Sequence, residues 1–468
     1  MDLYMKRMIV VGTYVLLFLI VIIFLSIGHY ENVYADNYTN ANLSDCLQIA
    51  LQNNINIKMA MEDVNAASLN LKITKGSNSI QVNGTVQTVE ILKSEAVNSS
   101  FNVPGKDTLI GLFVGASASY KLYDANKSNY ERLRELEYNN IALLALKTKN
   151  NIIRDVKIAF YQLAFAKKKS ELLEKLIKSF EIKFANVEQL FKNGQRTMLD
   201  ISRAQVDLTN ARLNYQRAQN EVAVAKSKLL TLMGIQIEPF DINIADIDID
   251  STIKEIPYSL DDLLETALQY SFDIKSAEIN QEIARTQIEI EKDRRLPVIN
   301  IIASLGYDNR AIQNGAFTES LSDRDNWKPT MHAGVSANFP IFTSGVLSSS
   351  IDRAAVSFNK ALYNTKTVVD TLSGNIKSYY NSLKDIKVQL DISRQLIENA
   401  RKYLELVQKN YDRGIITQNE LQDAELNYIN VTIDYIKILT DYYINYNQLI
   451  SLLCVDENIL FSKGVDAK

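Results

Sequence analysis

The sequence predicts a mainly α-helical chain with a small β-sheet, organised as two copies of one structural unit. Three observations support this prediction: an uninterrupted helical stretch at 124–191, a repeat that relates the two halves, and two stretches of alternating side chains in each half. Pro (6) and Gly (16) are scarce among the 468 residues, which favours long regular elements.

The stretch 124–191 contains no Pro or Gly. Its apolar residues are separated by threes, fours, sevens and tens, the spacing of a coiled-coil seam. They are Leu133, Leu136, Leu143, Ile153, Val156, Phe160, Leu163, Leu173, Leu176 and Phe180. A single helix of this length extends on the order of 100 Å, so it must pack lengthwise against other helices. Its charged face, with Lys167, Lys168 and Glu174, excludes a membrane-spanning helix; alone, the pattern also fits a cytosolic structural coiled coil.

A repeat relates the two halves of the chain. Leu43, Asp45, Leu47, Ala50, Leu51 and Ile57 recur 217 residues later as Leu260, Asp262, Leu264, Ala267, Leu268 and Ile274. The offset grows to 220 where Gly194 recurs as Gly414. Two tandem copies of one unit account for an offset that holds through helical, strand-like and turn-like segments. We therefore expect a first structural repeat at 36–240 and a second at 258–468.

An acidic linker at 241–257 joins the two repeats. Asp241, Asn243, Asp246, Asp248 and Asp250 alternate there with Ile residues. Carboxylate oxygens suit Ca²⁺, but a short strand with one solvated face accounts for the same alternation without an ion. The sequence favours the strand.

Each repeat is expected to contain a helix, two strands and then further helices. Ser44 is the expected N-cap of the first helix, and a second helix is expected at 58–75. Period-two alternation then predicts four strands in all. They lie at 80–87, 110–118, 297–307 and 330–339, with a polar loop at 98–105 between the first two.

These strands have the length of tilted transmembrane strands, about 9–11 residues. Aromatic residues gather at their ends, where a membrane-interface girdle would lie: Tyr120, Tyr123, Trp327, Phe339 and Phe342. Alternating strands also occur in soluble sandwiches, so the pattern leaves both environments open. In a membrane, four strands cannot close a barrel, and open edges would leave backbone groups unpaired in lipid. Several protomers would then share one barrel.

The start of the chain predicts export. Lys6 and Arg7 precede an apolar run at 9–27, and a polar segment ends at Ala35. This is the pattern of a signal peptide at 1–35. An uncleaved anchor is the alternative, since the run nears the length of a spanning helix. No Cys stands at position 36, which argues against a lipoprotein.

Composition and motifs exclude several function classes. A formal charge of −4 gives no broad attraction to nucleic acid. We expect no enzyme and no cofactor, because only His332 remains after position 35 and no phosphate loop or metal-ligand spacing occurs. Cys46 and Cys454 are too few for a disulfide scaffold, and we do not expect them to pair.

Three motifs recur at fixed places. Leu-x-x-x-Leu-x-x-Ala-Leu-x-x-Asn occupies 43–54 and returns from Leu260 with Ser271 in place of Asn. Pro-Ile-Phe-x-x-Gly occupies 340–345, although the first repeat keeps only Leu-Tyr-Asp at 122–124. The third motif is an aromatic residue, Gly three residues later, then an acid and Ala: Phe191, Gly194, Asp200 and Ala204, then Tyr411, Gly414, Glu420 and Ala424.

In order, spacing and duplication, these motifs resemble the TolC family of outer membrane efflux proteins, over nearly all of the chain after position 35. The resemblance implies a mainly α fold with a transmembrane β-barrel: a homotrimer with four strands per protomer, continued by a long α-helical periplasmic tunnel. It also implies the channel of a tripartite efflux or type I secretion system, seated in outer membrane lipid and joined to a periplasmic adaptor and an inner-membrane transporter. A non-transporting envelope coiled-coil spacer or adhesin is the alternative.

Two helix-to-helix turns are the expected docking tips. Gly194 and Gly414 supply backbone freedom where a helix ends, and Thr197 and Thr417 can cap the helices that follow. The resemblance places these turns, with Arg196, at the periplasmic end where an adaptor docks. The residues alone predict only helix ends.

The resemblance also implies a periplasmic gate near these turns. Its candidate residues are Asp200, Tyr411, Glu420 and Asp423. The family's Arg two residues after the second tip glycine is Ile416 here, which leaves Arg196 or Arg413 as substitutes. The alternative is that the acids are solvated and favourably placed near helix N-termini.

Overall fold

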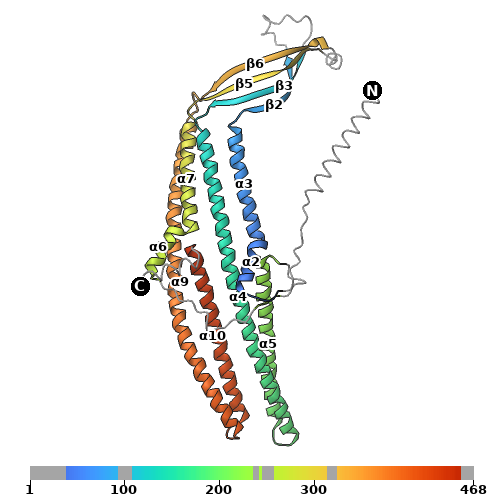
Figure 1. The fold of residues 1–468 in the computed structure, drawn as a ribbon, viewed down its shortest axis with the longest axis vertical. Coiled ribbons are helices and arrows are strands. Elements are labelled where there is room, and N and C mark those ends of the chain that lie inside the picture. Colours follow the sequence, from blue (N-terminus) through green and yellow to red (C-terminus); the bar gives the residue numbers. More distant parts are fainter. Residues whose placement is uncertain (1–37, 93–107, 236–241, 245–257, 314–323, 455–468) are drawn as a thin grey trace, which may run out of the picture.

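The computed structural model describes residues 38–92, 108–235, 242–244, 258–313 and 324–454. Figure 1 shows an elongated molecule with a four-stranded sheet at one end, two helical turns at the other, and long helices between them. The predicted signal peptide at 1–35 and the polar loop at 98–105 lie outside the described residues.

The two halves have the same order of elements. The first half contains β1 (Tyr38–Ala41), α2 (Leu43–Asn53), α3 (Ile55–Ser77), β2 (Gln81–Leu92), β3 (Thr108–Tyr123), α4 (Lys127–Lys192) and α5 (Met198–Met233). The second half contains β4 (Ile242–Ile244), α6 (Leu260–Tyr270), α7 (Phe272–Asp293), β5 (Val298–Gln313), the 3-10 helix η2 (Arg324–Asn326), β6 (Trp327–Asn338), α9 (Val346–Asp412) and α10 (Gln418–Leu453). The uninterrupted helix predicted at 124–191 is confirmed as the 66 residues of α4.

The four long strands form one antiparallel sheet in the order β2–β3–β5–β6, so β3 and β5 join the two halves. Alternation separates the side chains by face. One face is polar, with a row formed by Asn83, Ser117, Ser304 and His332. The other face is apolar and solvent-exposed in the protomer; its residues include Val82 (70%), Val86 (73%), Leu305 (65%), Met331 (76%) and Val335 (69%).

The helices continue the order of the strands. Near the sheet, α3 packs on α4, α4 on α7 and α7 on α9, and these helices connect directly to β2, β3, β5 and β6. Toward the other end, α5 packs on α4, α4 on α10 and α10 on α9. The protomer is therefore a curved layer whose lateral edges are β2, α3 and α5 on one side and β6 and α9 on the other (Figure 1).

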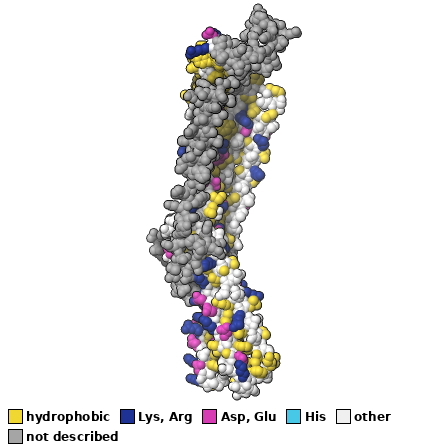
Figure 2. All heavy atoms as spheres, turned by 90° about the vertical axis from the view of Figure 1, so that its right-hand side faces the viewer, with side chains coloured by type: hydrophobic (Ala, Val, Ile, Leu, Met, Phe, Trp, Pro, Cys, Tyr) yellow, Lys and Arg dark blue, Asp and Glu magenta, His cyan; other side chains and the backbone are white. Residues whose placement is uncertain are grey.

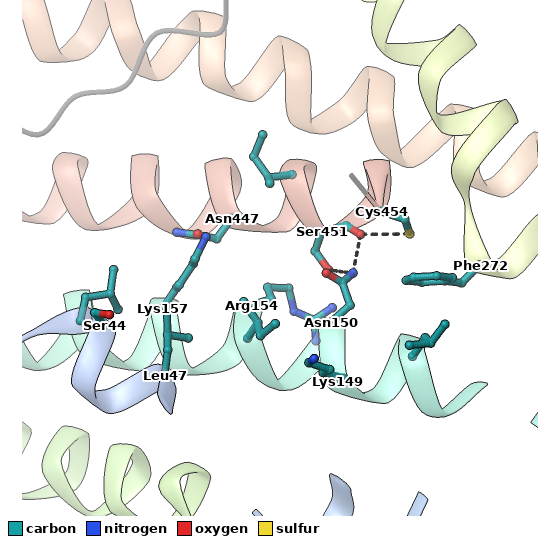
Figure 3. Close-up of a pocket in the computed structure, with 14 residues that line it drawn as sticks. Ser44, Leu47, Lys149, Asn150, Arg154, Lys157, Phe272, Asn447, Ser451 and Cys454 are labelled. Carbon is teal, nitrogen blue, oxygen red and sulfur yellow. Dashed lines mark hydrogen bonds between the residues drawn. The ribbon is translucent and has the colours of Figure 1, made fainter. Parts of the chain in front are cut away.

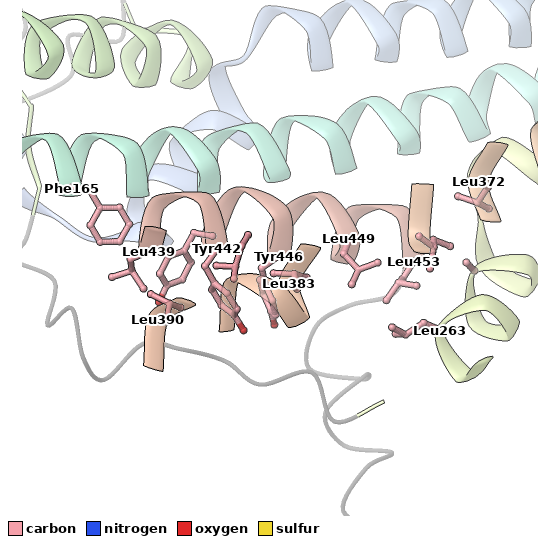
Figure 4. Packing of buried hydrophobic residues seen from close by; sticks show 14 of the residues in the cluster. Phe165, Leu263, Leu372, Leu383, Leu390, Leu439, Tyr442, Tyr446, Leu449 and Leu453 are labelled. Carbon is pink, nitrogen blue, oxygen red and sulfur yellow. The ribbon is translucent and has the colours of Figure 1, made fainter. Parts of the chain in front are cut away.

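The core lies mainly at the waist, where the short helices α2 and α6 join the long ones. One cluster packs α6, α9 and α10 together and contains Leu383, Leu390, Leu439, Tyr442 and Leu449, as Figure 4 shows. A second cluster packs α2, α3, α4, α5, β1 and β4 together and contains the fully buried Cys46. Tyr161 of α4 stacks on Tyr443 of α10 with ring centroids 4.0 Å apart, which links the two halves.

The start of the first helix differs from the sequence prediction, and only part of the linker is described. Asn42, and not Ser44, is the N-cap of α2, because Asn42 and Asp45 form a capping box. In the linker, Ile242–Ile244 form the short strand β4, which pairs in parallel with β1. The four aspartates of the linker, Asp241, Asp246, Asp248 and Asp250, lie outside the described residues.

Helix α5 ends against the junction of α2 and α3. Asn54 Nδ2 donates to the Leu232 carbonyl at 2.7 Å. Gly234 has φ +71°, and a Cβ placed on it would lie 2.6 Å from the Asn53 carbonyl oxygen. In the second half the corresponding residue is Cys454, which also has a positive φ of +54°. The first junction therefore requires glycine for both conformation and space.

This junction gives a stability prediction. Gly194 has the same φ of +71° with nothing within 4 Å of its added Cβ, so Gly194→Ala is expected to cost only the left-handed strain, about 1–2 kcal/mol. Gly234→Ala carries the same strain and a backbone clash, so its loss of stability should be clearly larger. The two variants are compared by thermal unfolding followed by circular dichroism. An equal loss of stability in both variants would contradict the steric account.

Candidate functional site

Two turns form the end of the molecule opposite the sheet (Figure 1). In the first, Gly194 N–H donates to the Phe191 carbonyl at 2.9 Å and Gln195 N–H to the Leu190 carbonyl at 2.8 Å. In the second, Gly414 N–H donates to the Tyr411 carbonyl at 2.8 Å. Both glycines have φ +71°. These are Schellman motifs, which satisfy the last carbonyls of α4 and α9.

Capping boxes start the two helices that follow the turns. Thr197 and Asp200 form the first, and Thr417 and Glu420 form the second. The sequence prediction that Thr197 and Thr417 are N-caps is therefore confirmed. Hydrogen bonds from the Thr197 backbone and side chain lower the pKa of Asp200, and the nearby positive charge of Arg196 adds to this.

The candidate gate residues occupy different environments. Glu420 and Asp423 are exposed on the same side of α10, one turn apart. Tyr411 is half-buried and packs beside Val407, Leu421 and Ala424, within its own hairpin. Asp200 lies on the other turn, where its carboxylate accepts from Thr197 at 3.0 Å. The structure therefore brings only Glu420 and Asp423 together as exposed acids.

The remaining tip residues are accessible. Arg196 and Arg413 are exposed, as are both tip glycines. Large apolar side chains flank them: Met198 is 64% exposed, Leu199 59% and Ile415 66%. Ile416, at the position of the family's Arg, packs beside the cluster of Val407, Leu421 and Ala424. It stabilises the hairpin and cannot serve as a charged gate partner.

A polar seam between α4 and α10, which the sequence analysis missed, lies near the turns. Ser179 of α4 donates through Oγ to Glu425, and its carbonyl accepts from Gln422 Nε2 at 3.4 Å. Asn186 Nδ2 donates to Gln418 at 3.4 Å. The sequence contains a signal for this seam. Residues spaced by seven along α10 begin with the polar Gln422 and continue with the apolar Ile429, Ile436, Tyr443 and Ile450. A polar residue in such a seam fixes the register of the two helices.

Figure 2 shows the charge distribution on one face of the molecule. Acidic and basic side chains are interspersed over its helical end, without a large region of one sign on this face. Within the described ranges, no group of three His, Cys, Asp or Glu side chains is arranged to hold a metal ion. Nor is any helix in those ranges long and apolar enough to cross a membrane.

The fold defines a class of protein in which an open sheet has one exposed apolar face. Long helices extend this sheet and end in a pair of turns. The chain matches the family model described as outer membrane efflux protein over residues 46–235 and 263–455. The chain belongs to the outer membrane efflux protein family, and the resemblance inferred from its motifs is confirmed.

Relatives and solved structures agree with this assignment. The chain is 21% identical to outer membrane protein TolC of Escherichia coli over 260 residues, 55% of this chain and 52% of that protein. It is 23% identical over 390 residues to the toluene efflux pump outer membrane protein TtgC of Pseudomonas putida, covering 82% of this chain and 77% of that one. The CmeC outer membrane channel of Campylobacter jejuni has the same fold, with a TM-score of 0.72, 17% identity and 93% of each chain covered.

Proposed function

We propose that this chain is the outer membrane channel of a tripartite efflux or type I secretion system and works as a homotrimer. The observation that carries the proposal is that the sheet and the helical layer end at the same two lateral edges. One contact between neighbouring copies would pair β6 with β2 and pack α9 on α3 and α5. Closing the ring removes the strand edges that a membrane does not tolerate. No enzymatic step is part of this proposal.

The side chains at the two edges support this contact. Helix α3 exposes Ile55 (67%), Met59 (60%) and Ile73 (66%), and α9 exposes Val356 (67%) and Tyr363 (70%). Lower down, α5 exposes Val206 and Leu213, and α9 exposes Ile392, Leu396 and Leu406. Apolar side chains in rows along both edges are suited to burial between copies. The exposed apolar face of the sheet would then contact lipid, and its polar face would line the lumen.

The turns support the assignment of partners. A ring of three copies would present six turns at one end, each with exposed apolar side chains. A periplasmic adaptor would dock there and connect the tube to an inner-membrane transporter, which would supply the energy and choose the cargo. The segment that begins at Lys6, in which basic residues precede an apolar run, supports delivery to the outer membrane by a signal peptide.

Oligomeric state tests the proposal first. Native mass measurement in mild detergent is expected to give three chains per particle, because the protomer exposes both sheet edges and an apolar face. A monomer that remains soluble and well folded without detergent would contradict the proposal.

Bulky residues at the tips should block docking without disturbing assembly. Gly194→Trp and Gly414→Trp are expected to leave trimers intact, since nothing lies within 4 Å of an added Cβ at either position. Crosslinking to the cognate adaptor should nevertheless be lost. Gly84→Trp in β2, on the sheet face that would contact lipid and also with open space around it, is the matched control. Unchanged adaptor crosslinking in both tip variants would leave these glycines with only a helix-ending role.

A further inference from the structure

The half of α9 nearer the turns carries an exposed row of side chains at coiled-coil spacing. The row advances by alternate steps of four and three residues, which keeps its members on one side of the helix. Its members are Ile392, Leu396, Asn399, Tyr403 and Leu406. The four apolar members are 51–61% exposed, and Asn399 is exposed as well. An apolar row with this spacing is suited to packing on a second helix.

The corresponding row on α4 is covered within one copy. An offset of 220 relates the ends of α4 and α9 and also the starts of α5 and α10. This offset places the α9 row on residues of α4 that are all buried or half-buried: Leu172, Leu176, Ser179, Lys183 and Asn186. Helix α10 covers part of that row, since Ser179 and Asn186 donate hydrogen bonds to it. The α9 row is therefore exposed where its counterpart is packed.

The α10 residues that cover the α4 row have exposed equivalents on α5. In one copy, Gln418, Gln422 and Glu425 of α10 contact Ser179 and Asn186 of α4. The offset of 220 relates these three α10 residues to three residues of α5: Met198, Ser202 and Gln205. All three α5 side chains are exposed. Helices α5 and α9 lie on opposite lateral edges of the protomer (Figure 1), so the two exposed rows are positioned to meet between copies.

A paired replacement at the end nearest the turns supports this contact. Inside a copy, Asn186 Nδ2 donates to Gln418 Oε1 at 3.4 Å. The equivalent residues are Leu406 of α9 and Met198 of α5, which are 61% and 64% exposed. Both members of a polar pair are thus replaced by apolar side chains. Such a joint change suits two residues in contact, because a polar group buried against an apolar one loses its hydrogen bonds.

The other end of the α4–α10 contact, at the waist, corresponds in the same way. Figure 3 shows Asn150 of α4 beside Ser451 of α10, where Asn150 Nδ2 donates to the carbonyl at 2.8 Å and to the hydroxyl at 3.1 Å. The equivalent residues are Asp370 of α9 and Thr231 of α5, and both are exposed. A hydroxyl can donate to a carboxylate. The correspondence extends from Asp370 to Leu406, about 54 Å of helix.

The polar member of the α9 row distinguishes between possible registers. Ser179 and Glu425, which form a hydrogen bond inside a copy, have Asn399 and Gln205 as their equivalents. The two amides can hydrogen-bond to each other. A shift of one heptad would instead place Asn399 against Met198 and bury an amide beside an apolar side chain. The unshifted register is therefore favoured.

We propose that α9 of one copy packs antiparallel on α5 of the next copy, in the register that α4 and α10 have within a copy. Asn399 would lie beside Gln205 of the next copy, and Leu406 beside its Met198. The inference rests on the proposed trimer and supplies the helix register of the contact between its copies.

Disulfide formation in the purified protein tests this register. Gln205→Cys with Asn399→Cys, and Met198→Cys with Leu406→Cys, are expected to link most chains into dimers and trimers under mild oxidation. A disulfide forms only where two Cα atoms come within about 7 Å of each other. All four positions are exposed in the protomer, so the substitutions should not disturb its fold. Non-reducing gel electrophoresis measures the linked species.

The matched controls recombine the same four substitutions. Met198→Cys with Asn399→Cys, and Gln205→Cys with Leu406→Cys, each displace the two thiols by seven residues, about 10 Å along the helices. Both controls should remain unlinked, although the two native thiols are present in every variant. Two differently tagged chains, one with Gln205→Cys and one with Asn399→Cys, should link to each other, because the bond joins different copies.

Links that are absent in the designed pairs, or equal in the designed and recombined pairs, would overturn the proposed register. Native mass measurement distinguishes this failure from failure of the proposed function. Trimers without the designed links would remove only the register, whereas monomers would contradict both. Links from Asn399→Cys to the adaptor in place of a second copy would also overturn the inference, because the α9 row would then be a docking groove for the adaptor.

Discussion

Replacing Gly115 with valine is expected to prevent formation of stable trimers. Gly115 of β3 pairs with Gly306 of β5, where the two halves of the sheet join. A Cβ on Gly115 would lie 2.5 Å from the Leu305 carbonyl oxygen and 2.7 Å from the Cα of Gly306. The strands would have to separate, and the ring of Phe113 would have to leave both glycines. Overpacking of this kind costs about 1–3 kcal/mol per site, and the proposed barrel contains three such sites.

Gly84→Val is the matched control. Gly84 lies on the exposed apolar face of the neighbouring strand β2, opposite Ala116, with nothing within 4 Å of an added Cβ. Valine has a higher strand propensity than glycine, so this variant should assemble as well as wild type. The measurement is the fraction of trimer in detergent at increasing temperature. Equal trimer content in the two variants would show that β3 and β5 are not held as closely as the structure places them.

Removing the acids at the second tip is expected to change ion selectivity. In a trimer, Glu420 and Asp423 would form two rings of like charge near the end of the helical tube, a feature that favours cations and binds multivalent ones. We expect Glu420→Ala with Asp423→Ala to weaken both cation preference and block by a trivalent cation added on the tip side. Bilayer conductance of the two proteins measures both effects.

Two further variants isolate the charge from the helix cap. Glu420 also forms a capping box with Thr417, and glutamine can preserve that bond. Glu420→Gln with Asp423→Asn should therefore match the alanine variant in conductance while keeping the cap. Asp434→Asn with Asp441→Asn removes the same charge from exposed positions farther along α10 and should leave block unchanged. Block that persists in the Glu420, Asp423 variants would place the gate elsewhere.

Local features were predictable from the sequence because they depend on neighbouring residues. Seam spacing predicted α4, and a Thr shortly after each tip glycine predicted both caps. The spacing of a capping box, an acid three residues after the cap, would have selected Asn42 over Ser44, since Asp45 stands three residues after Asn42. The lateral order β2–β3–β5–β6 was not predictable, because the pairing of β3 with β5 joins strands on either side of the repeat boundary.

Site residues were predictable from the sequence only where they lie on a single helix or turn. The two glycine turns were predictable because each turn depends on a few consecutive residues. The hydrogen bond between Gln422 and Ser179, in contrast, joins residues 243 apart in the sequence. A cavity at the waist likewise combines side chains from α2, α4, α7 and α10 (Figure 3). Their convergence depends on how the two halves pack, which no local spacing records. The candidate gate residue Asp200 also accepts hydrogen bonds in its own capping box.

Single-channel recording in planar bilayers tests the central claim most directly. Purified trimers are expected to give discrete conductance steps that disappear after Gly115→Val and lose cation preference after Glu420→Ala with Asp423→Ala. A spacer or adhesin of the same fold would insert without conducting. Trimers confirmed by native mass that give no steps, either as wild type or with the Glu420 and Asp423 substitutions, would contradict the channel assignment.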